Sequence, residues 1–133
     1  MPPVLVDTAV IYALADRRDG AHEAARELLK RLLEEGAPLL VSLPTVYEAH
    51  RLILYRLGTK PGLRFLTGYG QLYNLVWPTE GQHARAIQLL QRFADQKLSL
   101  TDAVTAIIAQ EVKARVATFD RHYELMGAHL VRR

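Results

Sequence analysis

Short apolar runs, uninterrupted by charged residues, recur along the chain between longer amphipathic stretches. Such runs are typical of strands that are buried on both faces, as in a parallel sheet. The first run reads VLV, and a later one, LYNLVWP, combines aromatic and β-branched residues before a proline stops it. We expect strands at 4–6, 39–42, 72–78 and 116–119, and an edge strand at 129–132.

The stretches between these runs carry apolar residues at helical spacing. From Ala21 to Leu32, for example, apolar residues recur every three or four positions, and Gly36 then ends the pattern. We expect helices at 8–15, 21–35 and 44–57, from 79 to about 94 and from within 98–104 to 114, with short helices near 61–67 and at 121–126.

Strands that alternate with helices indicate a parallel sheet covered on both faces. No repeat or linker interrupts this alternation, and 133 residues are the length of one domain. The sequence therefore predicts a single three-layer α/β/α domain over residues 1–133.

Composition removes several classes of function. The chain has no cysteine, which excludes disulfides, thiolate metal sites and cysteine nucleophiles. No apolar run approaches the roughly 20 residues of a membrane span. The start, MPPVLVDT, lacks the basic and apolar regions of a signal peptide. We expect a cytoplasmic protein without a membrane segment.

The net charge of +3 is weak evidence for a nucleic-acid partner. The chain carries 13 Arg against 4 Lys, and the guanidinium fork suits phosphate groups. The same preference equally reflects genome base composition, so charge alone does not decide the question.

Four acidic residues are expected at one edge of the sheet. Asp7 and Asp120 directly follow predicted strands, Glu48 lies early in the helix after the second strand, and Asp102 lies in the first turn of the helix before the fourth. In a parallel sheet all of these positions are at the carboxyl ends of the strands, where ligands bind.

Converging carboxylates repel one another unless a cation neutralises them. Without cysteines or a pair of closely spaced histidines, the available ligands are oxygen atoms, which favours Mg²⁺ or Mn²⁺. One or two such ions in an acidic site usually act on phosphate groups. We therefore expect Asp7, Glu48, Asp102 and Asp120 to form a metal-dependent catalytic site.

Each acid also has a simpler explanation. Asp7 and Asp120 could cap the helices that follow them, and Glu48 could be a solvated helix residue. Asp102 could be the third residue of a capping box that begins at Ser99. These alternatives stay open for each residue taken singly.

Four segments, LVDTAVIYALAD, SLPTVYEAHR, LSLTDAVTAIIAQ and VATFDRHYE, resemble the signature blocks of PIN-domain ribonucleases. The likeness runs from Val4 to about Leu130 and is strongest to the VapC-type toxins of toxin–antitoxin pairs. It implies a sheet with strand order 3-2-1-4-5. It also implies that the four acids hold Mg²⁺ or Mn²⁺ and activate water to cut RNA, with Thr8, Ser99 and Thr118 in supporting positions.

The RNA would enter across the rim of the site. Candidates for phosphate contacts are Arg17, Arg18, Arg51 and Arg121, although plain solvated charge is the better explanation for each of them. Tyr12 and Tyr47 could stack on bases, but we expect both to pack in the core.

Other phosphate chemistries fit less well. An aspartyl phosphatase needs a second Asp two residues after the first, where this chain has Ala9, and a receiver domain needs a lysine after its last strand. The serious alternative is a binding module that holds RNA without cutting it or joins a repressor complex. The resemblance implies a small antitoxin partner that reaches the acidic groove, and DNA contact only through that antitoxin. We expect the complex to be built on a homodimer, for which the apolar faces of helices 21–35 and 44–57 are weak support in the sequence.

Overall fold

Five parallel strands form one sheet in the order β3-β2-β1-β4-β5, in a computed structural model that describes residues 1–131. This order confirms the arrangement expected from the sequence. The strands all end at the same edge of the sheet, so that residues following β1 and β4 become neighbours. Their bounds are Val4–Val6 for β1, Leu39–Ser42 for β2, Asn74–Val76 for β3, Arg115–Ala117 for β4 and His129–Leu130 for β5.

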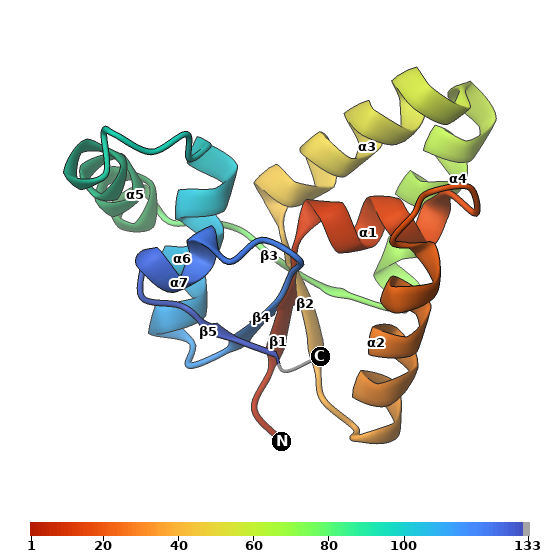
Figure 1. Cartoon of the computed structure of the whole chain (residues 1–133), viewed down its shortest axis with the longest axis horizontal. Helices are drawn as coiled ribbons and strands as arrows, with labels where there is room; N and C mark the ends of the chain where they lie inside the picture. Colours follow the sequence, from red (N-terminus) through yellow and green to blue (C-terminus); the bar gives the residue numbers. More distant parts are fainter. Residues whose placement is uncertain (132–133) are drawn as a thin grey trace.

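Helices cover both faces of the sheet, with α1 to α4 on one side and α5 to α7 on the other (Figure 1). No helix within residues 1–131 is long and apolar enough to cross a membrane. The helices are α1 Thr8–Ala15, α2 His22–Glu34, α3 Leu43–Leu57, α4 Thr59–Gly68, the 3-10 turn η1 Tyr69–Gln71, α5 Glu80–Arg92, α6 Leu100–Glu111 and α7 His122–Leu125.

Several predicted boundaries are wrong by a few residues. The strand expected at 72–78 is shorter, because the backbone N–H groups of Leu72 and Tyr73 still bond to the Tyr69 carbonyl of the preceding turn. The helix expected to reach 114 ends earlier, since Lys113 adopts a left-handed φ of 57°.

Two further boundaries differ. The short helix expected near 61–67 is the full α4. The strand expected at 116–119 begins and ends earlier, so Thr118 and Phe119 separate β4 from Asp120. The predicted edge strand at 129–132 is confirmed for its first two residues, and its last residue lies outside the described part of the chain.

The side chains of β1 belong to two separate apolar cores. Val4 and Val6 pack in the core that includes Leu28 and Leu32 of α2, whereas Leu5 packs on the opposite face with Ile108 of α6. All of these side chains are buried. The central strand is therefore fixed from both sides, and the residue that follows it inherits that rigidity.

Two helices end in the same glycine-dependent turn. After α7 the backbone N–H of Ala128 bonds to the Tyr123 carbonyl at 3.0 Å and that of Gly127 bonds to Glu124. Gly127 has a φ of 84°, the left-handed conformation that such a turn requires. Gly36, with a φ of 71°, closes α2 in the same way. The turn after α7 fixes the short helix that carries Tyr123.

Replacing these two glycines by alanine should separate backbone strain from crowding. A Cβ at Gly36 meets nothing within 4 Å, whereas one at Gly127 would lie 2.7 Å from Nε2 of Gln110, which donates to the Met126 carbonyl. Both variants should lose roughly 1–2 kcal/mol to left-handed strain. Gly127→Ala should lose about 1 kcal/mol more because that hydrogen bond is disturbed. Urea denaturation measures both losses, and equal losses would contradict the crowding argument.

Candidate active site

Asp7 lies at the carboxyl end of β1, where its backbone N–H still bonds to the Ala117 carbonyl of β4 at 3.0 Å. Its side chain is almost wholly buried, with 6% of its surface exposed. Oδ1 accepts from the backbone N–H of Thr8 at 2.7 Å and thereby caps α1, while Oδ2 accepts from the Thr118 hydroxyl at 2.7 Å. The capping role and the site role of Asp7 therefore coexist.

Asp102 also has two roles. It closes a capping box with Ser99, whose Oγ accepts from the Asp102 N–H at 3.0 Å while Asp102 Oδ2 accepts from the Ser99 N–H at 3.3 Å. Its other oxygen, Oδ1, accepts from the hydroxyl of Tyr123 at 3.0 Å. The cap orients the carboxylate so that one oxygen faces the helix backbone and the other faces the site.

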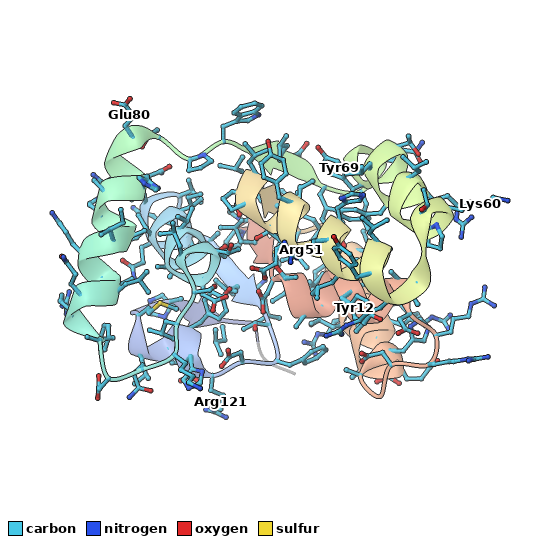
Figure 2. The ribbon with its side chains drawn as sticks, turned by 90° about the horizontal axis from the view of Figure 1, so that it is seen from above. Tyr12, Arg51, Lys60, Tyr69, Glu80 and Arg121 are labelled. Carbon is cyan, nitrogen blue, oxygen red and sulfur yellow. The ribbon has the colours of Figure 1, made fainter. Side chains whose placement is uncertain are left out.

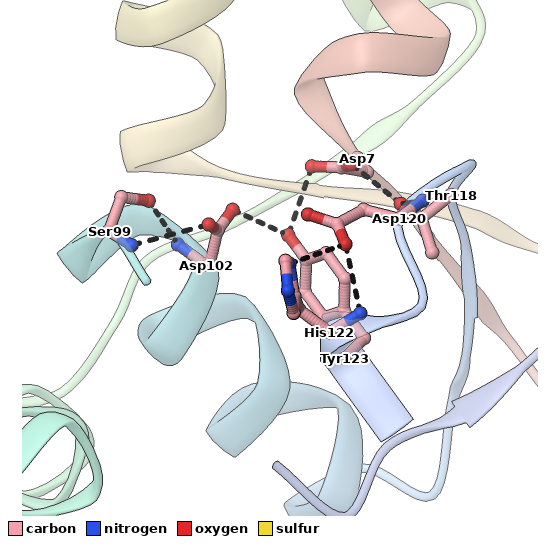
Figure 3. A network of polar contacts seen from close by, with 7 residues as sticks. All are labelled: Asp7, Ser99, Asp102, Thr118, Asp120, His122 and Tyr123. Atoms are coloured by element: carbon pink, nitrogen blue, oxygen red, sulfur yellow. Dashed lines mark hydrogen bonds and ion pairs between the residues drawn. The ribbon is translucent and has the colours of Figure 1, made fainter. Parts of the chain in front are cut away.

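Tyr123 joins the two carboxylates, and the sequence did not reveal it. Its hydroxyl lies 2.9 Å from Asp7 Oδ1 and 3.0 Å from Asp102 Oδ1 (Figure 3). The ring is completely buried in the apolar core beneath α6. The stretch RHYELM has the sequence of an ordinary helix turn, so Tyr123 can be recognised as part of the site only when the position of α7 is known.

Asp120 is connected to Asp7 through Thr118. The Thr118 hydroxyl accepts from the Asp120 N–H at 2.9 Å while it donates to Asp7. Asp120 Oδ1 accepts from the backbone N–H of His122 at 2.9 Å and lies 2.8 Å from its Nδ1. Its other oxygen has no hydrogen-bond partner among residues 1–131, and the side chain is 44% exposed. His122 is a second neighbour that the sequence did not reveal.

Glu48 is not joined to the other three acids. It lies in the second turn of α3, is half-buried and makes no hydrogen bond or ion pair with any residue in 1–131. One turn earlier, Thr45 lies 3.5 Å from Thr105 of α6, measured between hydroxyl oxygens, and Asp102 lies one turn before Thr105. Glu48 of α3 and Asp102 of α6 therefore each lie one helical turn from the contact between Thr45 and Thr105.

The three supporting residues expected from the sequence all lie beside the acids. Ser99 and Thr118 contact the acids, and Thr8 contributes its backbone N–H, while its own buried hydroxyl has no partner among the described residues.

Of the four arginines expected to contact RNA, Arg51 follows Glu48 by one turn and stacks on Tyr55. Arg51 and Arg121 are labelled in Figure 2, which looks down on this edge of the sheet.

Arg17 and Arg18 are not brought to the acids. They lie in the turn after α1, an eight-residue helix that carries them about 12 Å away from Asp7. Arg121 lies next to Asp120 and is paired with Glu124 at 3.1 Å. The core position expected for Tyr12 is confirmed. That expected for Tyr47 is wrong, because its ring is 65% exposed on the outer face of α3.

Burial dominates the electrostatics of the site. The pKa of Asp7 is raised to about 6, chiefly by burial and to a lesser extent by the neighbouring Asp102 carboxylate, against the hydrogen bonds from Thr118, Tyr123 and Thr8. Burial and the two facing carboxylates likewise raise the pKa of the Tyr123 hydroxyl. The phenol is therefore a neutral donor, and the acids carry more negative charge than these donors compensate.

This donor set fits a hard divalent cation. Within residues 1–131 no three His, Asp or Glu side chains already form a metal cage. Mg²⁺, however, usually takes one or two protein carboxylates and fills its other positions with water and substrate phosphates. Asp7 and Asp102 supply such a pair, and the unpartnered Thr8 hydroxyl beside Asp7 is a polar atom that a ligand or water could satisfy.

Comparison with known proteins agrees with this architecture. The PIN domain family matches residues 4–128, and the chain therefore belongs to that family. Its resemblance to VapC-type toxins is also found: a VapC ribonuclease of Archaeoglobus fulgidus is 22% identical over 125 residues, covering 91% of this chain and 79% of that protein.

Two solved structures share the fold. VapC20 of Mycobacterium tuberculosis, a toxin that cleaves the sarcin-ricin loop, has a TM-score of 0.84 at 22% identity, covering 98% of this chain and 99% of that one. VapBC2 of Rickettsia felis, bound to a DNA fragment from its promoter, has a TM-score of 0.74 at 9% identity, covering 97% and 96%. These likenesses confirm the PIN-like fold.

The raised pKa of Asp7 predicts an unusual dependence of stability on pH. Because the folded state holds the Asp7 proton more tightly than the unfolded chain does, stability falls as pH rises from about 4 to about 6. The loss is roughly 3 kcal/mol for a shift of this size. Asp7→Asn is neutral at every pH and should remove this loss.

The measurement is urea denaturation in EDTA at pH 4 and pH 8. Asp7→Asn should unfold at a higher urea concentration than the wild type at pH 8 and near the same concentration at pH 4. An equal difference between the two proteins at both pH values would show that Asp7 does not ionise within this window.

Proposed function

We propose that this chain is a metal-dependent endoribonuclease and the toxin of a type II toxin–antitoxin pair. The observation that carries the proposal is the carboxylate group at the carboxyl edge of the sheet. Asp7, Asp102 and Asp120 follow or begin three separate elements and, within residues 1–131, are linked through Thr118 and Tyr123. Helix capping alone does not explain why the acids are grouped, because burying Asp7 beside another carboxylate disfavours its charged form.

In this proposal Asp7 and Asp102 hold Mg²⁺ or Mn²⁺, with Asp120 and Glu48 reaching the same ion, a second ion or its water. A bound ion would supply activation of water and neutralisation of charge on the scissile phosphate. Asp7 is the central ligand because it follows the strand that is fixed from both faces. Asp102 lies at the N-terminus of α6, where the helix dipole places positive potential beside a bound anion or carboxylate.

The other residues of the site orient the Asp7 carboxylate, accept a proton or contact phosphate groups. Thr118 and Tyr123 hold the Asp7 carboxylate in one orientation. Asp120 keeps one oxygen free of hydrogen bonds with residues 1–131, so it can accept the proton of an attacking water. Arg51 and Arg121 lie on elements that border the acids and would contact phosphates of the RNA, whereas Arg17 and Arg18 are too distant to contact the phosphate that is cut.

An RNA cleavage assay tests the catalytic proposal. Purified protein with structured and unstructured RNA should cut in Mg²⁺ or Mn²⁺ and stop in EDTA. Asp7→Asn and Asp102→Asn should each lower the rate by more than about 100-fold, since even the outer partners of metal ligands are commonly worth 10–100-fold. Glu80→Gln, on the first turn of α5, is the matched control and should cut normally, and Figure 2 shows Glu80 well apart from Arg51 and Arg121.

Cleavage that persists in EDTA or in Asp7→Asn would disprove the metal mechanism. Tight, metal-independent RNA binding without cleavage of any substrate would instead support the binding-module alternative. Fluorescence anisotropy with the same RNAs distinguishes these results, because the two carboxylate variants should still bind RNA.

We also infer that an antitoxin docks in a groove formed by α1, α2, α4 and η1. Structural relatives of this chain include antitoxin–toxin complexes. Here α1, α2, α4 and η1 border a cavity of about 920 Å³ with an apolar floor that includes Leu29 and Phe65. Three exposed arginines, Arg17, Arg26 and Arg64, line its margin. An amphipathic helix with acidic residues beside its apolar face fits this surface.

Charge reversal at the margin tests the groove. Arg64→Glu should slow association with the proposed antitoxin by several-fold, because charges at the rim of an interface act mainly on the association rate. Arg92→Glu, an exposed arginine on α5 that stacks on Phe93, is the matched control and should associate normally. Association rates come from surface plasmon resonance at low and high salt. Equal rates for all three proteins would exclude this groove as the docking site.

The remaining expectations about assembly stay predictions. DNA contact only through the antitoxin, a homodimer and a cytoplasmic location are all part of the proposed toxin. Sedimentation analysis of the free chain and of its antitoxin complex would establish the oligomeric state.

A further inference from the structure

One fully buried hydroxyl faces the two central carboxylates from below. The Tyr123 side chain is 0% exposed, and its ring packs with Leu5 and Ile108 in the core beneath the sheet edge. Its oxygen lies 2.9 Å from Asp7, which follows β1, and 3.0 Å from Asp102 of α6, two residues that are far apart in the chain. Figure 3 shows the phenol oxygen at the meeting point of these two contacts.

We propose that Tyr123 is a positioning residue that presets the carboxylates of Asp7 and Asp102 for a divalent cation. The inference rests on the proposed function and names a residue that the expected set of acids does not contain. Tyr123 acts through the two carboxylates and does not itself contact the substrate.

The hydrogen bonds on Asp7 determine which oxygen is left for the ion. A carboxylate has about four lone-pair sites. On Asp7, Oδ1 accepts from both Thr8 N–H and the Tyr123 hydroxyl, and Oδ2 accepts from Thr118. When the Tyr123 proton lies on Asp7, the remaining site is on Oδ2. Tyr123 therefore directs Asp7 toward binding the ion through a single oxygen.

The direction from which the Tyr123 hydroxyl approaches the carboxylates matters as much as the number of hydrogen bonds on Asp7. Because Tyr123 is wholly buried, its hydroxyl reaches the carboxylates from the core, and a cation from solvent meets their other side. The phenol has one proton for two acceptors 2.9 and 3.0 Å away, so it can bond to either and keep both near it. Outer partners of metal ligands of this kind commonly change metal affinity by 10–100-fold.

The position of the hydroxyl is itself fixed by the backbone. The Tyr123 carbonyl accepts from the N–H groups of Met126 and Ala128 in the glycine turn after α7. At the other end of α7, Asp120 accepts from the backbone N–H of His122. The phenol is thus held at both ends of a helix of four residues, which suits a role that depends on its exact place.

Tyr123→Phe removes only the hydroxyl, and Tyr73→Phe is a matched control. Tyr73 is also buried, with 6% exposed, but its hydroxyl contacts no carboxylate within residues 1–131. Mn²⁺ titrations followed by electron paramagnetic resonance give the affinity of each protein without RNA. Tyr123→Phe should bind Mn²⁺ about tenfold or more weakly, and Tyr73→Phe should bind like the wild type. In the cleavage assay, Tyr123→Phe should need correspondingly more Mn²⁺ and regain most of its rate at saturation.

A second measurement uses the wild type and does not depend on the variant folding. With ¹³C-labelled tyrosine, the Tyr123 Cζ resonance should move on addition of Mg²⁺ while that of Tyr73 stays in place. A Tyr123 resonance that ignores Mg²⁺ would overturn the inference.

Two other results would also overturn it, and they identify what failed. If the wild type binds Mn²⁺ and cuts RNA but Tyr123→Phe binds Mn²⁺ equally or more tightly, the positioning role alone is wrong. If the wild type neither binds Mn²⁺ nor cuts RNA, the proposed function falls together with this inference.

Discussion

The burial of the Asp7 carboxylate next to Asp102 is the constraint around which this edge of the molecule is organised. A charged carboxylate in such surroundings is unfavourable unless donors or a cation compensate it. Thr8 supplies a backbone N–H, Thr118 a hydroxyl and Tyr123 a phenol, each from a different element. These three donors lower the cost only in part, since the pKa of Asp7 stays near 6. Much of the local architecture thus serves one side chain, and the remaining imbalance is what an ion would correct.

Structural and chemical roles are shared by the same residues. Asp7 caps α1, Asp102 closes the capping box of α6, and Asp120 holds the backbone at the start of α7. Each uses part of its carboxylate for the backbone and leaves part for the site. A helix start at the carboxyl edge of a parallel sheet therefore gives an acid both a reason to be there and a fixed orientation. The choice between cap and ligand is not exclusive for any of the three.

Most of the fold followed from local patterns, and the details of the site did not. The runs around Val4 and Val41 predicted strands because burial on both faces leaves no polar position, and Asp7 was placed correctly because it directly follows such a run. Tyr123 was not predicted because its hydrogen-bond partners lie 116 and 21 residues away in the sequence. Hydrophobic periodicity carries no information about contacts at such separations. The exposure of Tyr47 was missed for a related reason: the face that α3 turns toward solvent depends on where α4 and α6 pack.

The site is assembled from elements that belong to both sides of the sheet. Asp7 leads into α1 on one face, whereas Asp102 and Tyr123 belong to α6 and α7 on the other, and the two faces have separate apolar cores. A ligand that bridges these residues would bind the two layers together and would have no comparable site on the unfolded chain. By linkage, such a ligand raises the stability of the whole domain in proportion to the logarithm of its concentration. A ligand bound by these carboxylates would then connect the helical layers on the two faces of the sheet, and its binding would stabilise both apolar cores.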